Sequence, residues 1–395
     1  MGWSEIPEDI FLAIAEHLPT IIDYLNVSQV CKPWRSSALS PLNLAIPSQP
    51  PFLMLAESEG EENTSQCLRG FVVYSSNNQG NKVYNLSLPE IHHMRCMGST
   101  GNWLILINME LDIFMFNPFS KSKLHFPSQS TLPEQFNDEQ YGSGGDDDDD
   151  KEMFYTQEEM RNFFIQKVFL SSSNSKDVVA MAIFSGRRGL AIARPGDLSW
   201  TPVEIEINTF PNPVNAVEDA IFFKGQFYSV NRRGNVAACD ISSNPPKAIK
   251  IVGDFKDLCA VGKYYLVEWL GNLLLVARYF TSYETHPFYE TNRFEVYIFD
   301  FNNNEWEEVE SLGEHSLFLG FNTSVSLLIS EYSPFQRNCV YFTDNNSIAF
   351  FGDDMEGGHD MGVFDLNDKT IKPHYDELST SFHSPPLWII PQSIC

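Results

Sequence analysis

Residues 296–310 read VYIFDFNNNEWEEVE, which is an apolar strand, a polar turn that begins at Asp300, and a second strand that opens at Trp306. The same order recurs at 113–127 (IFMFNPFSKSKLHFP), 190–205 (LAIARPGDLSWTPVEI), 236–251 (VAACDISSNPPKAIKI) and 362–374 (GVFDLNDKTIKPH). The turn markers of these five stretches, Asn117, Pro195, Asp240, Asp300 and Asp365, are 78, 45, 60 and 65 residues apart. A period of about 45 residues, lengthened by insertions, is typical of four-stranded propeller blades.

Short β-rich runs separated by turn residues continue from Phe52 to the end of the chain. Counting 52–89 as one more unit gives about six blades. A β-sandwich, the alternative architecture, typically needs only about 100 residues. The repeat has neither a regular Gly-Gly doublet nor a Trp-Asp pair, so the kelch and WD patterns both fit it poorly. We therefore expect a mainly β fold, with a small α-helical module at 1–45 and a β-propeller domain at 46–395.

The first forty residues have a different, helical spacing of apolar side chains. Ile10, Phe11, Ile14 and Leu18 form one stripe, preceded by Pro7 and ended by Pro19. A second helix is predicted from about Asp23 through Cys31, with a break at Pro33 before Trp34. Three short helices bury little apolar surface by themselves, so this module is expected to lean on a partner or on the next domain.

The charge of the chain limits its partners. The sequence has 52 acidic and 26 basic residues, a net charge of −26 and a pI near 4.6. This balance argues against nucleic acid and membrane surfaces as partners. A segment at about 129–159 contains the run Asp146–Asp150, and we expect it to be a disordered acidic insertion between two blades. This run has two alternative interpretations: a calcium site, or an acidic segment that attracts a basic tail of the target. An unbroken run of Asp residues lacks the spaced ligands of calcium loops.

The N-terminus does not resemble a secretory signal, because it is acidic where such a signal is basic and then apolar. The seven cysteines are scattered and show no CxxC spacing, as is usual for reduced thiols. We therefore expect the protein in the cytoplasm, the nucleus or both.

No pattern in the sequence indicates catalysis. Phosphate-binding loops and GxSxG elbows are absent, and neither the His92-His93 pair, expected on opposite faces of a strand, nor His359-Asp360, expected in a solvated loop, has zinc spacing. Asp300, Asp365 and Glu268 could supply a glycosidase pair, but equivalent repeat positions favour turn capping. We expect no catalytic residue, no metal and no cofactor.

Two arginine pairs are the sharpest candidates for contact with a target. Arg187-Arg188 and Arg232-Arg233 each follow a predicted strand and lie in a glycine-containing turn. Such pairs are either solvated hairpin tips or a binding rim for an acidic or phosphorylated segment.

Two parts of the sequence resemble known families. The order Ile6-Pro7-x-Asp9-Ile10 followed by Val30-Cys31-x-x-Trp34-Arg35 resembles the F-box. The stretches 296–329, 338–345 and 361–371 are similar to the KIB-type β-propeller that follows the F-box in a large family of plant proteins. The F-box resemblance implies binding to a Skp-type adaptor. The implied contacts are Ile6, Pro7, Ile10, Phe11, Ile14 and Leu18, with Val30, Cys31 and Trp34 packing the module and partly joining the interface.

The combined resemblance implies a non-catalytic substrate-recognition subunit of a Skp-cullin-F-box (SCF) ubiquitin ligase. In this interpretation the adaptor links the chain to the cullin, and the propeller binds a protein target for ubiquitination. Two alternatives remain open at this point: an F-box scaffold without a role in degradation, and a propeller that binds or hydrolyses glycans.

Overall fold

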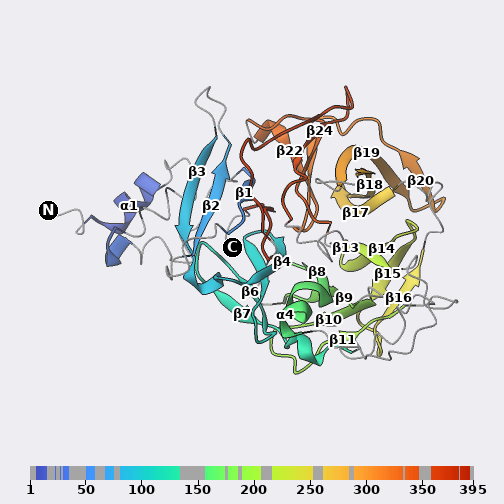
Figure 1. Cartoon of the computed structure of the whole chain (residues 1–395), viewed down its shortest axis with the longest axis horizontal. Coiled ribbons are helices and arrows are strands. Elements are labelled where there is room, and N and C mark those ends of the chain that lie inside the picture. The colour runs from blue at the N-terminus through green and yellow to red at the C-terminus, as the bar shows by residue number, and fades with distance from the viewer. Residues whose placement is uncertain are drawn as a thin grey trace.

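The computed structural model describes residues 6–15, 23, 27, 30–34, 50–57, 67–74, 81–133, 156–173, 177–185, 189–205, 216–251, 261–283, 289–331, 334–346, 357–381 and 383–391. Its strands form six sheets that surround a common centre as the blades of a propeller (Figure 1). The predicted mainly β fold with about six blades is therefore confirmed. No helix of the described residues is long and apolar enough to cross a bilayer.

The blades follow one another along the chain. Blade 1 contains β26 (Leu387–Ile389), β1 (Phe52–Met54), β2 (Leu68–Val73) and β3 (Lys82–Ser87). Blade 2 contains β4 (Arg95–Thr100), β5 (Trp103–Ile107), β6 (Ile113–Phe116) and β7 (Lys123–His125). Blade 3 contains β8 (Ile165–Leu170), β9 (Ala180–Phe184), β10 (Gly189–Ala193) and β11 (Thr201–Pro202).

Blade 4 contains β13 (Val217–Phe223), β14 (Gln226–Asn231), β15 (Val236–Asp240), β16 (Lys247–Lys250) and the parallel edge strand β12 (Glu204–Ile205). Blade 5 contains β17 (Val261–Trp269), β18 (Asn272–Ser282), β19 (Tyr289–Asp300) and β20 (Glu305–Glu308). Blade 6 contains β22 (Val325–Leu328), β21 (His315–Leu319), β23 (Cys339–Phe342), β24 (Gly362–Asp365) and β25 (Ile371–Lys372). The helical elements of the described residues include α1 (Glu8–Ala15), α4 (Gln157–Glu159) and the single turns η2 (Pro89–Ile91), η3 (Gln129–Thr131), η4 (Met160–Phe164) and η6 (Ile329–Glu331).

The repeated turns of the sequence join the last two strands of their blades in chain order. The Asn117 Oδ1 atom accepts the backbone N–H groups of Phe119 and Ser120 at 2.9 and 3.0 Å. Asp300 and Asp365 each accept the N–H two residues later at 2.8 Å. Such local caps satisfy the backbone of a tight turn. Glu268 likewise accepts the Gly271 N–H at 2.7 Å, so the turn-capping interpretation of these acidic residues is confirmed.

The ring is closed by the two ends of the propeller sequence. Strand β26 supplies the first strand of blade 1 and pairs antiparallel with β1, with Leu53 opposite Trp388. Trp388 is fully buried, and its ring packs against the His374 ring at 5.1 Å between centroids, with the two planes tilted by 50°. The His374 Nδ1 atom lies 3.1 Å from the Tyr74 hydroxyl, and Nε2 lies 3.1 Å from the Phe342 carbonyl oxygen. Because a carbonyl only accepts, Nε2 carries the proton and Nδ1 accepts from Tyr74, which is the neutral form.

This buried histidine makes ring closure sensitive to acid. Burial lowers the pKa of His374 to about 4, below the ordinary value of 6.5. Protonation therefore favours the unfolded chain, and stability is lost as the pH falls from about 6.5 to about 4, by roughly 3 kcal/mol at 1.36 kcal/mol per pKa unit. Urea unfolding of the wild type and of His374→Gln at pH 7 and pH 4 should show a smaller acid-induced loss in the variant. Equal losses in both proteins would exclude His374 as the acid-sensitive group.

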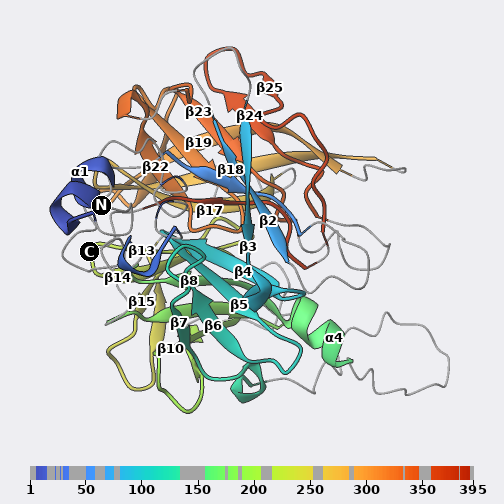
Figure 2. The ribbon, with the colours of Figure 1, turned by 90° about the vertical axis from the view of Figure 1, so that its left-hand side faces the viewer.

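The two ends of the ring carry different segments. Apart from the parallel edge strand β12, strands alternate in direction within blades 1 to 5, so turns between the second and third strands lie at one end, which we call the loop face. Segments that lead into the inner strands β4, β8 and β26 reach the ring from the same end. We call the opposite end the tether face, because the chain that comes from the N-terminal module enters the propeller there, at the start of β1. Figure 2 shows α1 on the side of the tether face and α4 on the other side.

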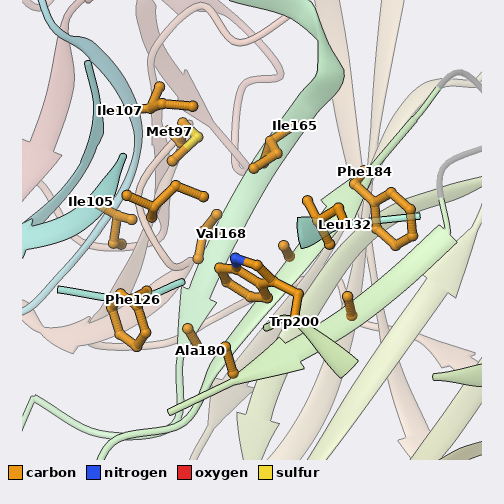
Figure 3. Packing of buried hydrophobic residues seen from close by; sticks show 14 of the residues in the cluster. Met97, Ile105, Ile107, Phe126, Leu132, Ile165, Val168, Ala180, Phe184 and Trp200 are labelled. Carbon is orange, nitrogen blue, oxygen red and sulfur yellow. The ribbon is translucent and has the colours of Figure 1, made fainter. Parts of the chain in front are cut away.

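Apolar side chains fill the spaces between neighbouring blades. Between blades 2 and 3, Trp200 lies close to Phe126 and Val168 in a buried cluster (Figure 3). The Trp200 indole N–H donates to the Pro127 carbonyl at 2.9 Å, so its polar edge is satisfied. Burial of such large side chains stabilises the contact by about 25 cal/mol per Å² of apolar surface.

The expected limits of the acidic insertion are wrong at both ends. Gln129 is fully buried in η3, and its side-chain amide donates to the Met160 carbonyl at 2.9 Å. At the other end, Thr156 and Glu159 form a capping box at the start of α4. These ordered contacts exclude Gln129 and Thr156–Glu159 from a disordered segment. Residues 134–155, which include the run Asp146–Asp150, lie outside the described residues.

Four blades meet in a polar contact near the centre of the ring. The Lys167 ammonium of β8 lies 2.9 Å from Asp219 of β13 and donates to the Gly320 carbonyl at 3.0 Å. Asp219 also accepts the Leu266 N–H of β17 at 3.0 Å. Both charged side chains are almost completely buried. This ion pair therefore ties blades 3, 4, 5 and 6 together.

Candidate functional site

Helix α1 divides its apolar residues between a core and an exposed face. The helix starts after Pro7, whose carbonyl accepts the Phe11 N–H at 3.0 Å, and Glu8 and Asp9 occupy its first turn, where negative charge is favoured. Phe11 is only 1% exposed, whereas Ile10 and Ile14 are 50% and 40% exposed. Residues four apart lie above one another on a helix, so Ile10 and Ile14 form one continuous apolar patch.

The buried side of the module is held by an aromatic pair. The rings of Phe11 and Trp34 lie 5.4 Å apart, and Trp34 is 9% exposed. Trp34 belongs to a helical segment that begins at Lys32, so the break expected between Pro33 and Trp34 is wrong. Proline is tolerated there because its missing N–H falls in the first helical turn, where no intrahelical acceptor is needed.

The described residues that the F-box resemblance implied thus fall into three groups: exposed, half-buried and core. Pro7, Ile10, Ile14 and Val30 are exposed, with Val30 at 61%, while Ile6 and Cys31 are half-buried. Phe11 and Trp34 form the core of the module. Leu18 lies outside the described residues. We use the name adaptor face for Ile10, Ile14 and Val30, the exposed apolar residues among the contacts that the resemblance implies. Exposed apolar side chains on so small a module are typical of a surface that a protein partner covers.

On the loop face, Arg232 is already paired. Its Nε atom donates to Glu218 at 2.7 Å, and Glu218 is buried at the start of β13. The Arg233 backbone N–H donates to Asn231 within the turn. Arg187 and Arg188 lie outside the described residues. The charge of Arg232 is therefore partly neutralised within the chain.

A second group of basic side chains on the loop face, two arginines and a histidine, was not indicated by the sequence. Arg95 begins β4, Arg161 lies in η4 just before β8, and His383 lies shortly before β26. The Arg95 Nη1 group donates to the Arg161 carbonyl at 2.9 Å, and the Arg161 guanidinium lies 3.2 Å from the His383 ring. The contacts link residues 66 and 222 positions apart, so no local spacing could have revealed them. We call Arg95, Arg161 and His383 the cation cluster.

Beside the cation cluster, three residues could together hold a metal ion. Ligand atoms of Glu57, Cys67 and His92 all lie within 4.8 Å of one another. The present contacts use these groups otherwise: His92 lies 2.5 Å from Glu57, and the Arg69 guanidinium lies 3.7 Å from the same carboxylate. Burial raises the pKa of the Cys67 thiol to about 12. A metal ion would therefore have to displace a proton and compete with Arg69.

Two expectations for histidines are wrong. His92 and His93 follow η2 in a turn, with ring centroids 3.8 Å apart, rather than pointing to opposite faces of a strand. A positive φ of 53° at His93 allows this arrangement. The His359-Asp360 pair is buried rather than solvated, because Asp360 binds the fully buried Arg278 at 2.8 Å and accepts the Thr291 N–H.

A helical module with an exposed apolar face, ahead of a six-bladed propeller, defines the class of F-box proteins with a propeller domain. Comparison with known families gives the same result: the F-box-like family matches residues 3–44, and the KIB1-4 beta-propeller family matches residues 73–365. The chain belongs to the KIB1-4 beta-propeller family and carries an F-box-like module. This organisation is, in general, that of a substrate adaptor of SCF ligases.

Similar proteins come from Arabidopsis thaliana and share the whole organisation. The putative F-box protein At5g55150 is 25% identical over 100% of this chain and 98% of its own length. The F-box protein SKIP23 is 25% identical over 98% of this chain and 96% of its own length. The putative F-box/kelch-repeat protein At5g24040 is 22% identical over 98% of both chains.

Proposed function

We propose that the protein is the substrate-recognition subunit of an SCF ubiquitin ligase. The adaptor face binds a Skp-type adaptor, and through it the cullin, while the loop face of the propeller binds a protein target. The observation that supports this assignment most directly is the pair Ile10 and Ile14, which stay exposed although Phe11 of the same helix is buried. Apolar anchors of this kind dominate protein interfaces once they are desolvated.

The arrangement of the two faces supports the division of labour. Helix α1 lies on the side of the tether face, and the loop face points away from it (Figure 2). A target on the loop face would therefore not compete with the adaptor for space. Ubiquitin transfer in this proposal is carried out by the ligase that the adaptor recruits, and the chain contributes binding alone. The same proposal places the protein in the cytoplasm or nucleus.

The target surface is proposed to include the four arginines of the predicted rim. Of these, Arg232 and Arg233 lie in the turn between β14 and β15, on the loop face. Arg187 and Arg188 belong to the segment that joins β9 and β10, the corresponding strands of blade 3. An acidic or phosphorylated target segment is the natural partner of such side chains.

A capture experiment with the full-length chain tests this function. Targets are collected with the variant Ile10→Asp with Ile14→Asp, which is expected not to bind the adaptor. Captured proteins are then not ubiquitinated and degraded. We expect a reconstituted complex of the wild type with adaptor and cullin to ubiquitinate these proteins, and the variant complex to leave them unmodified. Captured proteins that remain unmodified with the wild-type complex would favour a scaffold without a degradation role. Identical lists after Arg232→Ala with Arg233→Ala, and after Arg187→Ala with Arg188→Ala, would reject the arginine rim.

A further inference from the structure

Arg95 is a buried cation that no carboxylate of the described residues reaches within ion-pair distance. Its side chain is 95% buried, because the residue is 5% exposed, and its one hydrogen bond to a described residue goes to the Arg161 carbonyl. No carboxylate of the described residues lies within ion-pair distance of it, so most of the five N–H donors of this guanidinium meet no acceptor there. Burying a charge in this way is costly unless a partner is present.

The neighbours of Arg95 add to the positive charge. Arg161 is 2% exposed and contacts both the His383 ring and the His93 carbonyl, the latter at 3.2 Å. Arg69, 1% exposed, donates to the Ser384 hydroxyl at 2.6 Å, next to His383. Among the described residues, the nearby carboxylates are Glu57, which binds His92 and Arg69, and Glu158, which lies 3.5 Å from Arg161 and is 61% exposed. Within this part of the chain three arginines thus converge where two carboxylates offset them, and neither carboxylate reaches Arg95.

The ionisation of the cluster shows the same imbalance. Burial, together with the charge of Arg161, lowers the pKa of Arg95 to about 9. Burial lowers the pKa of His383 to about 4, and the charges of Arg161, His93 and Arg95 act in the same direction. Burial is the larger cause of both shifts and the neighbouring positive charges add to it, so a bound anion would favour the charged forms of these side chains.

We propose that the cation cluster of Arg95, Arg161 and His383 is a binding site for a phosphate monoester dianion, supplied by a phosphorylated side chain of the target. A dianion matches several donors on fixed side chains, and guanidinium groups bind phosphate oxygens through paired hydrogen bonds. The assignment of the phosphate to a target rests on the proposed function, since the cluster lies on the loop face. Exposed His93 and half-exposed His383 place the cluster at the protein surface.

The site itself is tested with orthophosphate on the full-length chain in complex with its adaptor. Dissociation constants are measured calorimetrically at constant ionic strength, with chloride as the balancing anion. We expect Arg95→Gln to weaken orthophosphate binding at least about tenfold, as loss of a charge-assisted donor pair does. The matched control is Arg337→Gln, which removes an exposed arginine already paired with Glu314 and should change the constant less than about twofold.

Because Arg95 is buried, a second variant guards against misfolding. His383→Gln removes a half-exposed ring of the same cluster, and we expect it to weaken orthophosphate binding while the melting temperature without phosphate stays at the wild-type value. Orthophosphate binding that is equal in wild type, Arg95→Gln and His383→Gln would overturn the site.

The source of the phosphate is tested separately. A library of phosphoserine, phosphothreonine and phosphotyrosine peptides is presented to the same complex, before and after phosphatase treatment. We expect retention of a subset of phosphopeptides that is lost after dephosphorylation and lost with Arg95→Gln but not with Arg337→Gln. Orthophosphate binding without phosphopeptide retention would reject a phosphorylated target and leave a small soluble phosphate ester as the ligand. Adaptor pull-down is measured independently, so failure of the proposed function and failure of this site give different results.

Discussion

Replacing Ile10 and Ile14 together with aspartate is expected to abolish adaptor binding and to leave the fold unchanged. The two side chains are 50% and 40% exposed, so the free protein tolerates charge there. In the complex each carboxylate would have to lose its water in an apolar contact, which costs several kcal/mol. A loss of at least about 3 kcal/mol lowers affinity more than about 100-fold. Pull-down of a purified Skp-type adaptor, with the melting temperature as a measure of folding, checks this result.

The matched control places the same two charges on the propeller. Leu198 and Leu378 are 93% and 79% exposed, and Leu198→Asp with Leu378→Asp adds an equal negative charge to this acidic chain. Adaptor binding should be unchanged in this control, which separates a local effect from general charge repulsion. Phe11→Ala tests the core instead: a buried aromatic residue costs about 3–5 kcal/mol when it is truncated, so this variant should unfold the module. If the Ile10 and Ile14 double variant still pulls down as much adaptor as the wild type, the assignment of the adaptor face is wrong.

Breaking the central ion pair is expected to have the largest effect on propeller stability. Lys167 and Asp219 are both almost completely buried, and burial lowers the pKa of Lys167 and raises that of Asp219, so each depends on its partner to stay charged. Removing one partner of such a pair costs about 3–5 kcal/mol because the other charge is left uncompensated. Lys167→Met and Asp219→Asn should each lower the free energy of unfolding by this amount. Urea unfolding monitored by tryptophan fluorescence measures the change.

The double variant distinguishes the charge from the packing. Asparagine keeps an acceptor for the Leu266 N–H, and methionine fills the volume of the lysine stem, so combining both changes should restore more than half of either single loss. The exposed pair of Arg337 and Glu314 provides the control, since Arg337→Met should cost less than about 1 kcal/mol. If Lys167→Met lowers the free energy of unfolding no more than Arg337→Met does, the central ion pair of Lys167 and Asp219 contributes little to holding the blades together.

Turn chemistry is the part of this fold that could be predicted well from sequence. Asn117, Asp300 and Asp365 accept N–H groups only two or three residues away, so the signal for each turn is complete within a few letters. The repeat of these turns then indicated the blades and their approximate number. The helical stripe of the first module was visible for the same reason. Its division into the buried Phe11 and the exposed Ile10 was not, because only the contact with Trp34 decides which side faces inward.

By itself, therefore, the sequence determined the class of fold, the position of the F-box-like module and the capped turns, since each depends on contacts between near neighbours in the chain. The tertiary structure alone decided where the charges meet. Lys167 and Asp219 are 52 residues apart, and Arg161 and His383 are 222 apart. Such pairs are brought together by the closure of the ring, in which β26 joins β1. A closed ring places the starts of its inner strands side by side whatever their separation in sequence, and no local pattern records that proximity.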